Sequence, residues 1–254
     1  MFEAEIAGKL PQLAEYEDYL TSCVFGALKY LPPNRGLLPV LARARNYRLG
    51  MSLGKHCERE GIDLRTITDA HFVFWPTCKE PQPSEPDLVV ILEGKPRSFI
   101  VPIEVKYFAS KHGVEEDDQL MRYYRAVRTA RARSTCNSAM IRQFSGEPLA
   151  VIYVTQFAAT HEIRATRLQL ASMGLGPAQD RIFGLKWQHV YEEIRRLSCS
   201  ETGHYRRRIL LDIRELLEHK HLTPFVGFRD PPSSLPAEAL ETRPIFFRSE
   251  ERRD

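Results

Sequence analysis

Apolar residues recur at helical spacing in the first quarter of the chain. Spacings of three and four residues predict a helix over 12–31, and Pro32-Pro33 ends this run. A second helical stretch is predicted over 37–60, just before Gly61. The apolar positions of the first helix should face the core, and they are Leu13, Leu20, Val24 and Leu28.

The apolar period then shortens to that of β-strands. Turn residues fill 93–97 between two β-branched apolar runs, so 87–107 is predicted to be a hairpin. Pro102 lies in the second run and cannot donate to a ladder, which implies a bulge or a locally unpaired edge there. The predicted strands of this region are 71–75, 88–92 and 99–107.

Helical and extended patterns alternate through the rest of the chain. The predicted elements are a helix over 115–133, strands over 149–157 and 181–187, and helices over 188–197 and 203–220. This order predicts an α/β fold in which helices flank a central mixed β-sheet, with extra C-terminal helices. We expect one domain over 1–230, followed by a polar, proline-rich tail over 231–254.

Composition narrows the class of protein. The chain is 43% hydrophobic and 27% charged, as expected of a globular protein that buries a core. The net charge of +3 does not by itself indicate nucleic acid. No apolar run approaches the ~18 residues of a membrane span, and no signal peptide is recognisable. We therefore expect a cytoplasmic protein with no membrane partner.

The five cysteines are an odd number, and no two of them form a Cys-x-x-Cys pair. This pattern argues against a structural zinc site or a disulfide framework. It favours a reducing compartment.

Three charged residues flank the predicted hairpin. Glu104 and Lys106 share one face of an otherwise apolar strand, and Asp87 precedes the partner strand. Burying such charges is costly unless they are paired or used. The hairpin brings Asp87 back toward Glu104, and a hard divalent cation would relieve the repulsion between their carboxylates. A lysine beside such an ion can orient water and counter charge on a phosphate.

Pro86-Asp87 followed by Glu104-Val105-Lys106 resembles the PD-(D/E)xK nuclease superfamily, which has the restriction-endonuclease-like fold. The resemblance implies an α-β-β-β-α-β core over about 12–157. It implies a DNA nuclease that hydrolyses phosphodiester bonds. Asp87 and Glu104 would hold Mg²⁺ (or Mn²⁺), and Lys106 would be the catalytic lysine.

Two further features extend the resemblance. Gln119 and Tyr123 form a Gln-x-x-x-Tyr pair on one helix face, as in the RecB-like branch, and Arg122 lies on the same side. These three residues would bind DNA. Glu17 lies on the core face of the first helix, where superfamily members often carry a further catalytic or metal-binding glutamate. The C-terminal cysteine group by which many RecB-like nucleases hold an iron–sulfur cluster is absent.

Other interpretations stay open. Glu104 and Lys106 can form an ordinary ion pair on an exposed edge. The arginines Arg122, Arg125, Arg128 and Arg131 either contact phosphates or form a solvated helix face.

The alternative function is a catalytically inactive nuclease-fold subunit that binds nucleic acid or assembles with other proteins. The segment after Glu17 also resembles stand-alone bacterial nucleases of anti-phage defence. That resemblance implies a regulatory or sensor subunit as a partner. A homo-oligomer, the strandedness of the substrate and the mode of cleavage all stay open.

Overall fold

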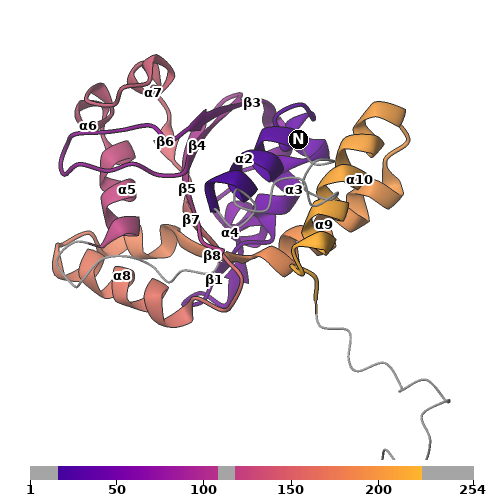
Figure 1. The fold of residues 1–254 in the computed structure, drawn as a ribbon. Coiled ribbons are helices and arrows are strands. Elements are labelled where there is room, and N and C mark those ends of the chain that lie inside the picture. The colour runs from indigo at the N-terminus through magenta and orange to yellow at the C-terminus, as the bar shows by residue number, and fades with distance from the viewer. Residues whose placement is uncertain (1–16, 108–117, 225–254) are drawn as a thin grey trace, which may run out of the picture. The chain divides into compact units, whose positions relative to one another are not determined.

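A mixed β-sheet of eight strands organises the protein (Figure 1). The computed structural model describes residues 17–107 and 118–224. The strands are β1 Arg45–Asn46, β2 Met51–Ser52, β3 Ile67–Phe74, β4 Leu88–Gly94, β5 Phe99–Val105, β6 Glu147–Pro148, β7 Val151–Thr155 and β8 Ile182–Lys186. Their order is β2-β1-β8-β7-β5-β4-β3, and β6 pairs with β5 beside this path.

The centre of the sheet is parallel and its flanks are antiparallel. β5, β7 and β8 run parallel, whereas β3, β4 and β5 form an antiparallel meander. The register of the β4–β5 hairpin pairs Leu88 with Ile103, so the predicted hairpin is confirmed. β1 and β2 close the other flank by antiparallel pairing with β8.

Helices cover both faces of the sheet (Figure 1). On one face β5 contributes Phe99, Val101, Ile103 and Val105 to a core shared with the N-terminal and C-terminal helices. On the other face the middle helices pack on β5 and β7. The helices are α2 Glu17–Leu28, α3 Leu37–Ala42, α4 Leu53–Arg59, α5 Gln119–Arg128, α6 Ala130–Ser134, α7 Ala139–Gln143, α8 Thr160–Ser172, α9 Trp187–Ser200 and α10 His204–His219. Short 3₁₀ turns occur at η1 Pro33–Arg35, η2 Leu64–Thr66 and η3 Gly176–Arg181.

This architecture confirms the predicted α/β fold with a central mixed sheet and C-terminal helices. The strand predicted over 181–187 is β8, and the helices predicted over 188–197 and 203–220 are α9 and α10. The first helix is seen from Glu17 onward, and the part predicted over 12–16 lies outside the described residues. The described residues belong to one compact unit, and the predicted tail over 231–254 also lies outside them.

The single helix predicted over 37–60 is wrong. α3 and α4 are separated by the two short strands β1 and β2. Asn46 causes the interruption, because its side chain accepts hydrogen bonds from the backbone N–H groups of Arg48 and Leu49, a turn that competes with the helix. Gly50 then takes a positive φ of 64°, and the Ser52 hydroxyl caps α4 by accepting from Lys55.

The helix predicted over 115–133 is divided in two. Thr129 is extended, at φ −120° and ψ 152°, and its hydroxyl caps α6 by accepting from the N–H of Ala132. Two further helices were not predicted at all, α7 and α8. α8 buries only Ile163, Thr166 and Leu170, so its sequence has a weak apolar stripe for the helical period to reveal.

Pro102 lies where β5 changes partners. The backbone N–H of Lys106 donates to Val154 on β7, so the Pro102 nitrogen, four residues earlier, points to the same side. On that side the pairing with β6 ends at Ile100 and the pairing with β7 begins at Ile103. The locally unpaired edge that Pro102 implied is confirmed, in the middle of the sheet rather than at its rim.

The cysteine prediction is wrong, because Cys78 and Cys136 form a disulfide. The two residues lie 58 positions apart, in the loops after β3 and after α6, so no local spacing marks them. The cysteine pattern therefore no longer argues for a reducing compartment. Of the remaining cysteines, Cys23 and Cys57 are buried and Cys199 is exposed. Within the described ranges, no helix combines the length and the apolar character that crossing a membrane requires.

Candidate active site

Asp87 lies at the mouth of the β4–β5 hairpin. It directly precedes β4, and the register places it across from Glu104 on β5. Its side chain is 9% exposed, and Oδ2 accepts a hydrogen bond of 2.7 Å from the backbone N–H of Val105. Its own carbonyl accepts from the N–H of Trp75 at 3.1 Å. The Val105 N–H therefore orients the Asp87 carboxylate, and the Trp75 N–H fixes the Asp87 backbone.

Glu104 and Lys106 project from the same face of β5 and its end, as their spacing predicted. Glu104 is 1% exposed and Lys106 is 4% exposed, so the exposed-edge ion pair is excluded. Lys106 Nζ lies 2.8 Å from Glu104 Oε1. Its backbone N–H donates to Val154, and its carbonyl accepts from the indole N–H of Trp187 at 3.2 Å. The lysine is thus fixed along its whole length.

Glu17 completes the charged cluster from the opposite layer. It is the first described residue of α2, whose apolar side chains pack on the face of the sheet that includes Val105. Its Oε1 accepts a hydrogen bond of 2.8 Å from Lys106 Nζ. The Lys106 ammonium therefore bridges the carboxylates of Glu104 and Glu17. Glu17, Glu104 and Lys106 lie together, as we expected from the sequence. The sequence did not predict that Lys106 would contact both acids.

Burial and like charge set the protonation of the cluster. Desolvation, followed by the negative charge of Glu104, raises the pKa of Asp87 to about 8. Desolvation also raises the pKa of Glu104, against the opposing effect of Lys106. Burial works to lower the pKa of Lys106, but Glu104 and Glu17 outweigh it and raise that pKa above its usual range. Lys106 is therefore an ammonium at neutral pH.

Tyr123 and Gln119 lie beside the charged cluster, on α5. Gln119 Nε2 donates to the Tyr123 hydroxyl at 2.6 Å, and that hydroxyl donates to the carbonyl of Glu85 at 3.1 Å. Burial, followed by the charge of Glu104, raises the pKa of Tyr123. Tyr123 is 1% exposed, and its hydroxyl interacts with the Glu104 carboxylate as well as with the carbonyl of Glu85. Arg122 donates to the carbonyl of Pro83 in the same loop.

Tyr153 also belongs to this cluster, although the sequence pattern did not predict it. It pairs with Glu104 across β5 and β7 and is fully buried. Burial, followed by the charges of Glu162 and Glu104, raises the pKa of its hydroxyl. A tyrosine at the centre of the apolar run 149–157 was the available sign. Its partner Glu162 lies on α8, which the sequence did not predict, and the two oxygens are 3.5 Å apart.

The donor set suits a hard divalent cation. Glu104 Oε2 is buried and has no hydrogen-bond partner among the described residues. A buried carboxylate oxygen without a hydrogen bond destabilises the folded protein unless a cation or a proton binds it. Asp87 adds a second carboxylate and Glu17 a third, and oxygen donors are the ligands that Mg²⁺ takes. Glu17, Asp87 and Glu104 do not bring three ligand atoms within 4.8 Å of one another, and Lys106 lies between two of them.

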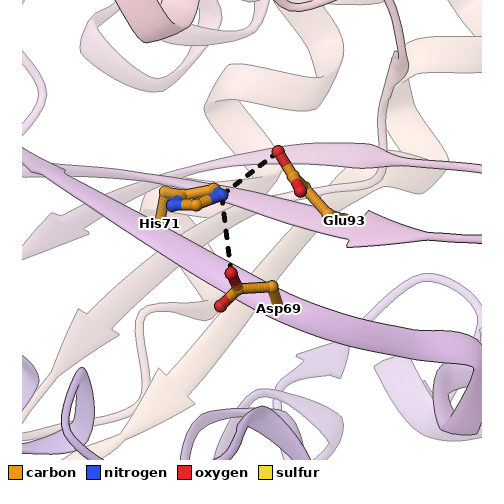
Figure 2. Close-up of side chains that lie close together, drawn as sticks. All are labelled: Asp69, His71 and Glu93. Carbon is orange, nitrogen blue, oxygen red and sulfur yellow. Dashed lines mark ion pairs between the residues drawn. The ribbon is translucent and has the colours of Figure 1, made fainter.

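A second group of side chains that could hold a metal lies on β3 and β4. Figure 2 shows Asp69 and His71 on one strand facing Glu93 on its neighbour. One ligand atom from each of the three side chains lies within 4.8 Å of the other two. His71 Nε2 is 3.1 Å from Glu93 and 3.9 Å from Asp69. The acids are 62% and 56% exposed, so water solvates them without an ion. Asp87 and Glu93 are at opposite ends of β4, about 20 Å apart at ~3.3 Å per residue.

Comparison with models of protein families, with curated proteins and with solved structures finds no match for this chain.

Proposed function

We propose that this protein is a Mg²⁺- or Mn²⁺-dependent nuclease of the PD-(D/E)xK type, which hydrolyses phosphodiester bonds in DNA. One observation carries the proposal. Asp87, Glu104 and Lys106 are buried together at the end of the hairpin, and one Glu104 oxygen has no partner among the described residues. Such charges are retained in a core when function requires them more than stability does.

Asp87 and Glu104 would hold the ion. Glu17 would become a further ligand only if Lys106 moved from between Glu17 and Glu104. When bound, such an ion supplies a Lewis acid for the phosphate and lowers the pKa of water. The raised pKa of Asp87 means that ionising both Asp87 and Glu104 is energetically unfavourable. A bound divalent cation would offset this repulsion.

Lys106 supplies positive charge in this proposal, not a base. Its ammonium donates hydrogen bonds from a fixed, buried position, where it can orient a water molecule and counter charge developing on the phosphate. Glu17 holds that ammonium and stays partly open to solvent, with a side chain that is 29% exposed. The pair therefore presents a positive donor at the rim of the buried carboxylates.

Tyr123 is a positioning residue in this scheme. Its hydroxyl links Gln119 to the carbonyl of Glu85, two residues before Asp87. This contact supports the loop that carries Asp87, and the contact of Tyr123 with DNA stays a prediction. Gln119 keeps a buried oxygen, Oε1, without a hydrogen-bond partner among the described residues.

The test is cleavage of linear and circular DNA in Mn²⁺, in Mg²⁺ and in chelator. We expect Asp87→Asn, Glu104→Gln and Lys106→Gln each to lower the cleavage rate by at least about a thousandfold, because each removes a charge at the reacting phosphate. The variants are isosteric or close to it, so thermal unfolding should report folded proteins.

Glu93→Gln is the matched control, since it removes a carboxylate from the same strand at the opposite end of the hairpin. It should cleave at the wild-type rate. Full activity of Asp87→Asn, or loss of activity in Glu93→Gln alone, would overturn the assignment. DNA binding without cleavage in any metal would favour the non-catalytic subunit instead.

A further inference from the structure

Three arginines line a cavity beside the candidate active site. The cavity measures about 500 Å³, and its walls include Glu80 and Pro81 from the loop after β3 and arginines from α5 and α6. The arginines are Arg125, Arg128 and Arg131. We call this cavity the arginine groove. Three arginines against one glutamate leave a formal charge of +2 on its walls.

The arginines are not neutralised by their neighbours. Arg131 pairs with Glu80 at 3.2 Å, but the two side chains are 86% and 44% exposed, and such pairs contribute little. Arg125 donates to the neutral amide of Gln82 at 3.3 Å. Arg128 has no ion pair or side-chain hydrogen bond within the described part of the chain and is exposed. The groove therefore presents at least two guanidinium groups to an anion.

The arginine groove is connected to the candidate active site through α5 and through the loop that ends at Asp87. Arg125 and Arg128 follow Tyr123 by two and five residues on α5, which places them roughly 3 and 8 Å further along the helix axis. The opposite wall is the loop that continues through Glu85 into Asp87. Arg125 lies about 200° round the helix from Tyr123, so the groove opens on the more exposed side of α5. Phosphates that leave the buried carboxylates would follow the loop past Pro83 and Gln82 to reach these arginines.

The break in the helix at Thr129 allows Arg131 to line the arginine groove together with Arg125 and Arg128. On one continuous helix, positions 125, 128 and 131 would rotate progressively away from a common face, because three residues fall short of a full turn. Thr129 is extended and starts α6 anew, and Arg131 lines the same cavity as Arg125 and Arg128. Guanidinium groups bind phosphate oxygens in a bidentate manner, which suits a backbone contact.

We propose that the arginine groove binds the phosphate backbone of the DNA strand on one side of the scissile phosphate, without contacting base edges. This inference rests on the proposed nuclease function and extends it by naming where the substrate lies. Contacts of this kind fix position and add affinity that is independent of sequence.

The experiment measures DNA binding in chelator, where no cleavage occurs. The anisotropy of a fluorescent DNA single strand and of its duplex is recorded between about 50 and 200 mM NaCl. For Arg125→Ala/Arg128→Ala we expect roughly tenfold weaker binding. The salt slope should fall by about 1.8 for the duplex and about 1.4 for the single strand, since each lost phosphate contact removes ~0.9 or ~0.7 from the slope. The loss should be equal for unrelated sequences.

Two controls keep the result interpretable. Arg207→Ala removes an exposed arginine from α10, on the other face of the sheet, and should leave affinity and slope unchanged. Arg125→Lys/Arg128→Lys keeps the charges and should retain most of the slope. An unchanged salt slope of DNA binding in the double alanine variant would overturn the proposal that the groove binds DNA. So would competition by inorganic phosphate as strong as by DNA.

The two proposals fail separately. If the wild-type protein cleaves DNA and the double alanine variant binds as tightly as wild type, the nuclease stands and the groove is wrong. If no metal supports cleavage but the salt slope of the double alanine variant falls as expected, the groove binds a phosphate backbone, and both the nuclease assignment and the placement beside a scissile phosphate are wrong.

Discussion

At the scale of single residues, the candidate site is a balance of buried charge. Asp87 and Glu104 are both acidic and nearly inaccessible, and Lys106 compensates only part of their charge. An apolar environment strengthens every such interaction, whether attractive or repulsive. The cluster is therefore most costly in the absence of a cation and at a pH where all carboxylates ionise.

Asp87 gives this balance a measurable pH dependence. Its pKa of about 8 in the native state exceeds the value near 3.9 of an unfolded chain, so between these limits the native state binds the extra proton. Stability in chelator should then fall as pH rises from about 4 to 8. Asp87→Asn removes the ionisation and keeps an acceptor for Val105. We expect it to unfold at a higher temperature than wild type at pH 8, with a smaller gap at pH 5.

Differential scanning calorimetry in chelator measures both proteins. Added Mn²⁺ should raise the unfolding temperature of wild type at pH 8. The difference in unfolding temperature between wild type and Asp87→Asn should then become smaller. Equal pH profiles for the two proteins would contradict a raised pKa at Asp87.

At the scale of elements, the loop between β3 and β4 carries the site. Its isolated bridge between Cys78 and Ser84 closes it on itself, and the bonds of Tyr123 and Arg122 fasten it to α5. The disulfide to Cys136 ties the start of the loop to the turn after α6. The position of Asp87 thus depends on β5, on α5 and on the turn after α6, all of which are distant from it in sequence.

Reducing this disulfide should destabilise the protein. Loop-closure entropy for residues 58 positions apart predicts a loss of up to about 4 kcal/mol. Thermal unfolding with and without a phosphine reductant measures it, and Cys78→Ala/Cys136→Ala should be insensitive to the reductant. Cys199→Ala removes an exposed thiol and should respond like wild type. An identical unfolding temperature for wild type in both buffers would exclude a stabilising disulfide.

At the scale of the whole molecule, the sheet separates two packed layers. One layer joins α2, α9 and α10 to β5, and the other joins α5 and α8 to β5 and β7. Lys106 links them at the end of the sheet, through Glu17 on one side and Glu104 on the other. A structural change in either layer can therefore alter the positions of the charged side chains at the ends of the strands.

The C-terminal helices should be part of the same cooperative unit. Ile213 of α10 is fully buried in the core that includes β5, so Ile213→Ala should cost about 2–5 kcal/mol. Urea denaturation followed by circular dichroism and by fluorescence of the buried Trp187 should give one shared, shifted transition. Arg207→Ala on the same helix should not shift it. Two separate transitions would show that α10 unfolds alone.

Much of this could be predicted from local pattern. The hairpin is visible because β-branched runs flank turn residues, and Glu104 and Lys106 share a face because side chains alternate along a strand. Glu17 was found because an acid on an apolar helix face needs a partner. The interruption at Asn46 and the helix α8 were missed, since turn chemistry and weak amphipathicity leave little periodic trace.

The sequence by itself determined the alternation of helices and strands, the hairpin and the identity of the charged residues, because each depends on neighbours a few positions away. Tertiary structure alone decided that Lys106 joins Glu17 to Glu104, that Tyr123 holds the Glu85 carbonyl, and that Cys78 bonds to Cys136. These contacts join residues tens of positions apart. Only packing of the layers on the sheet fixes such distances, and with them the burial that gives the charges their chemistry.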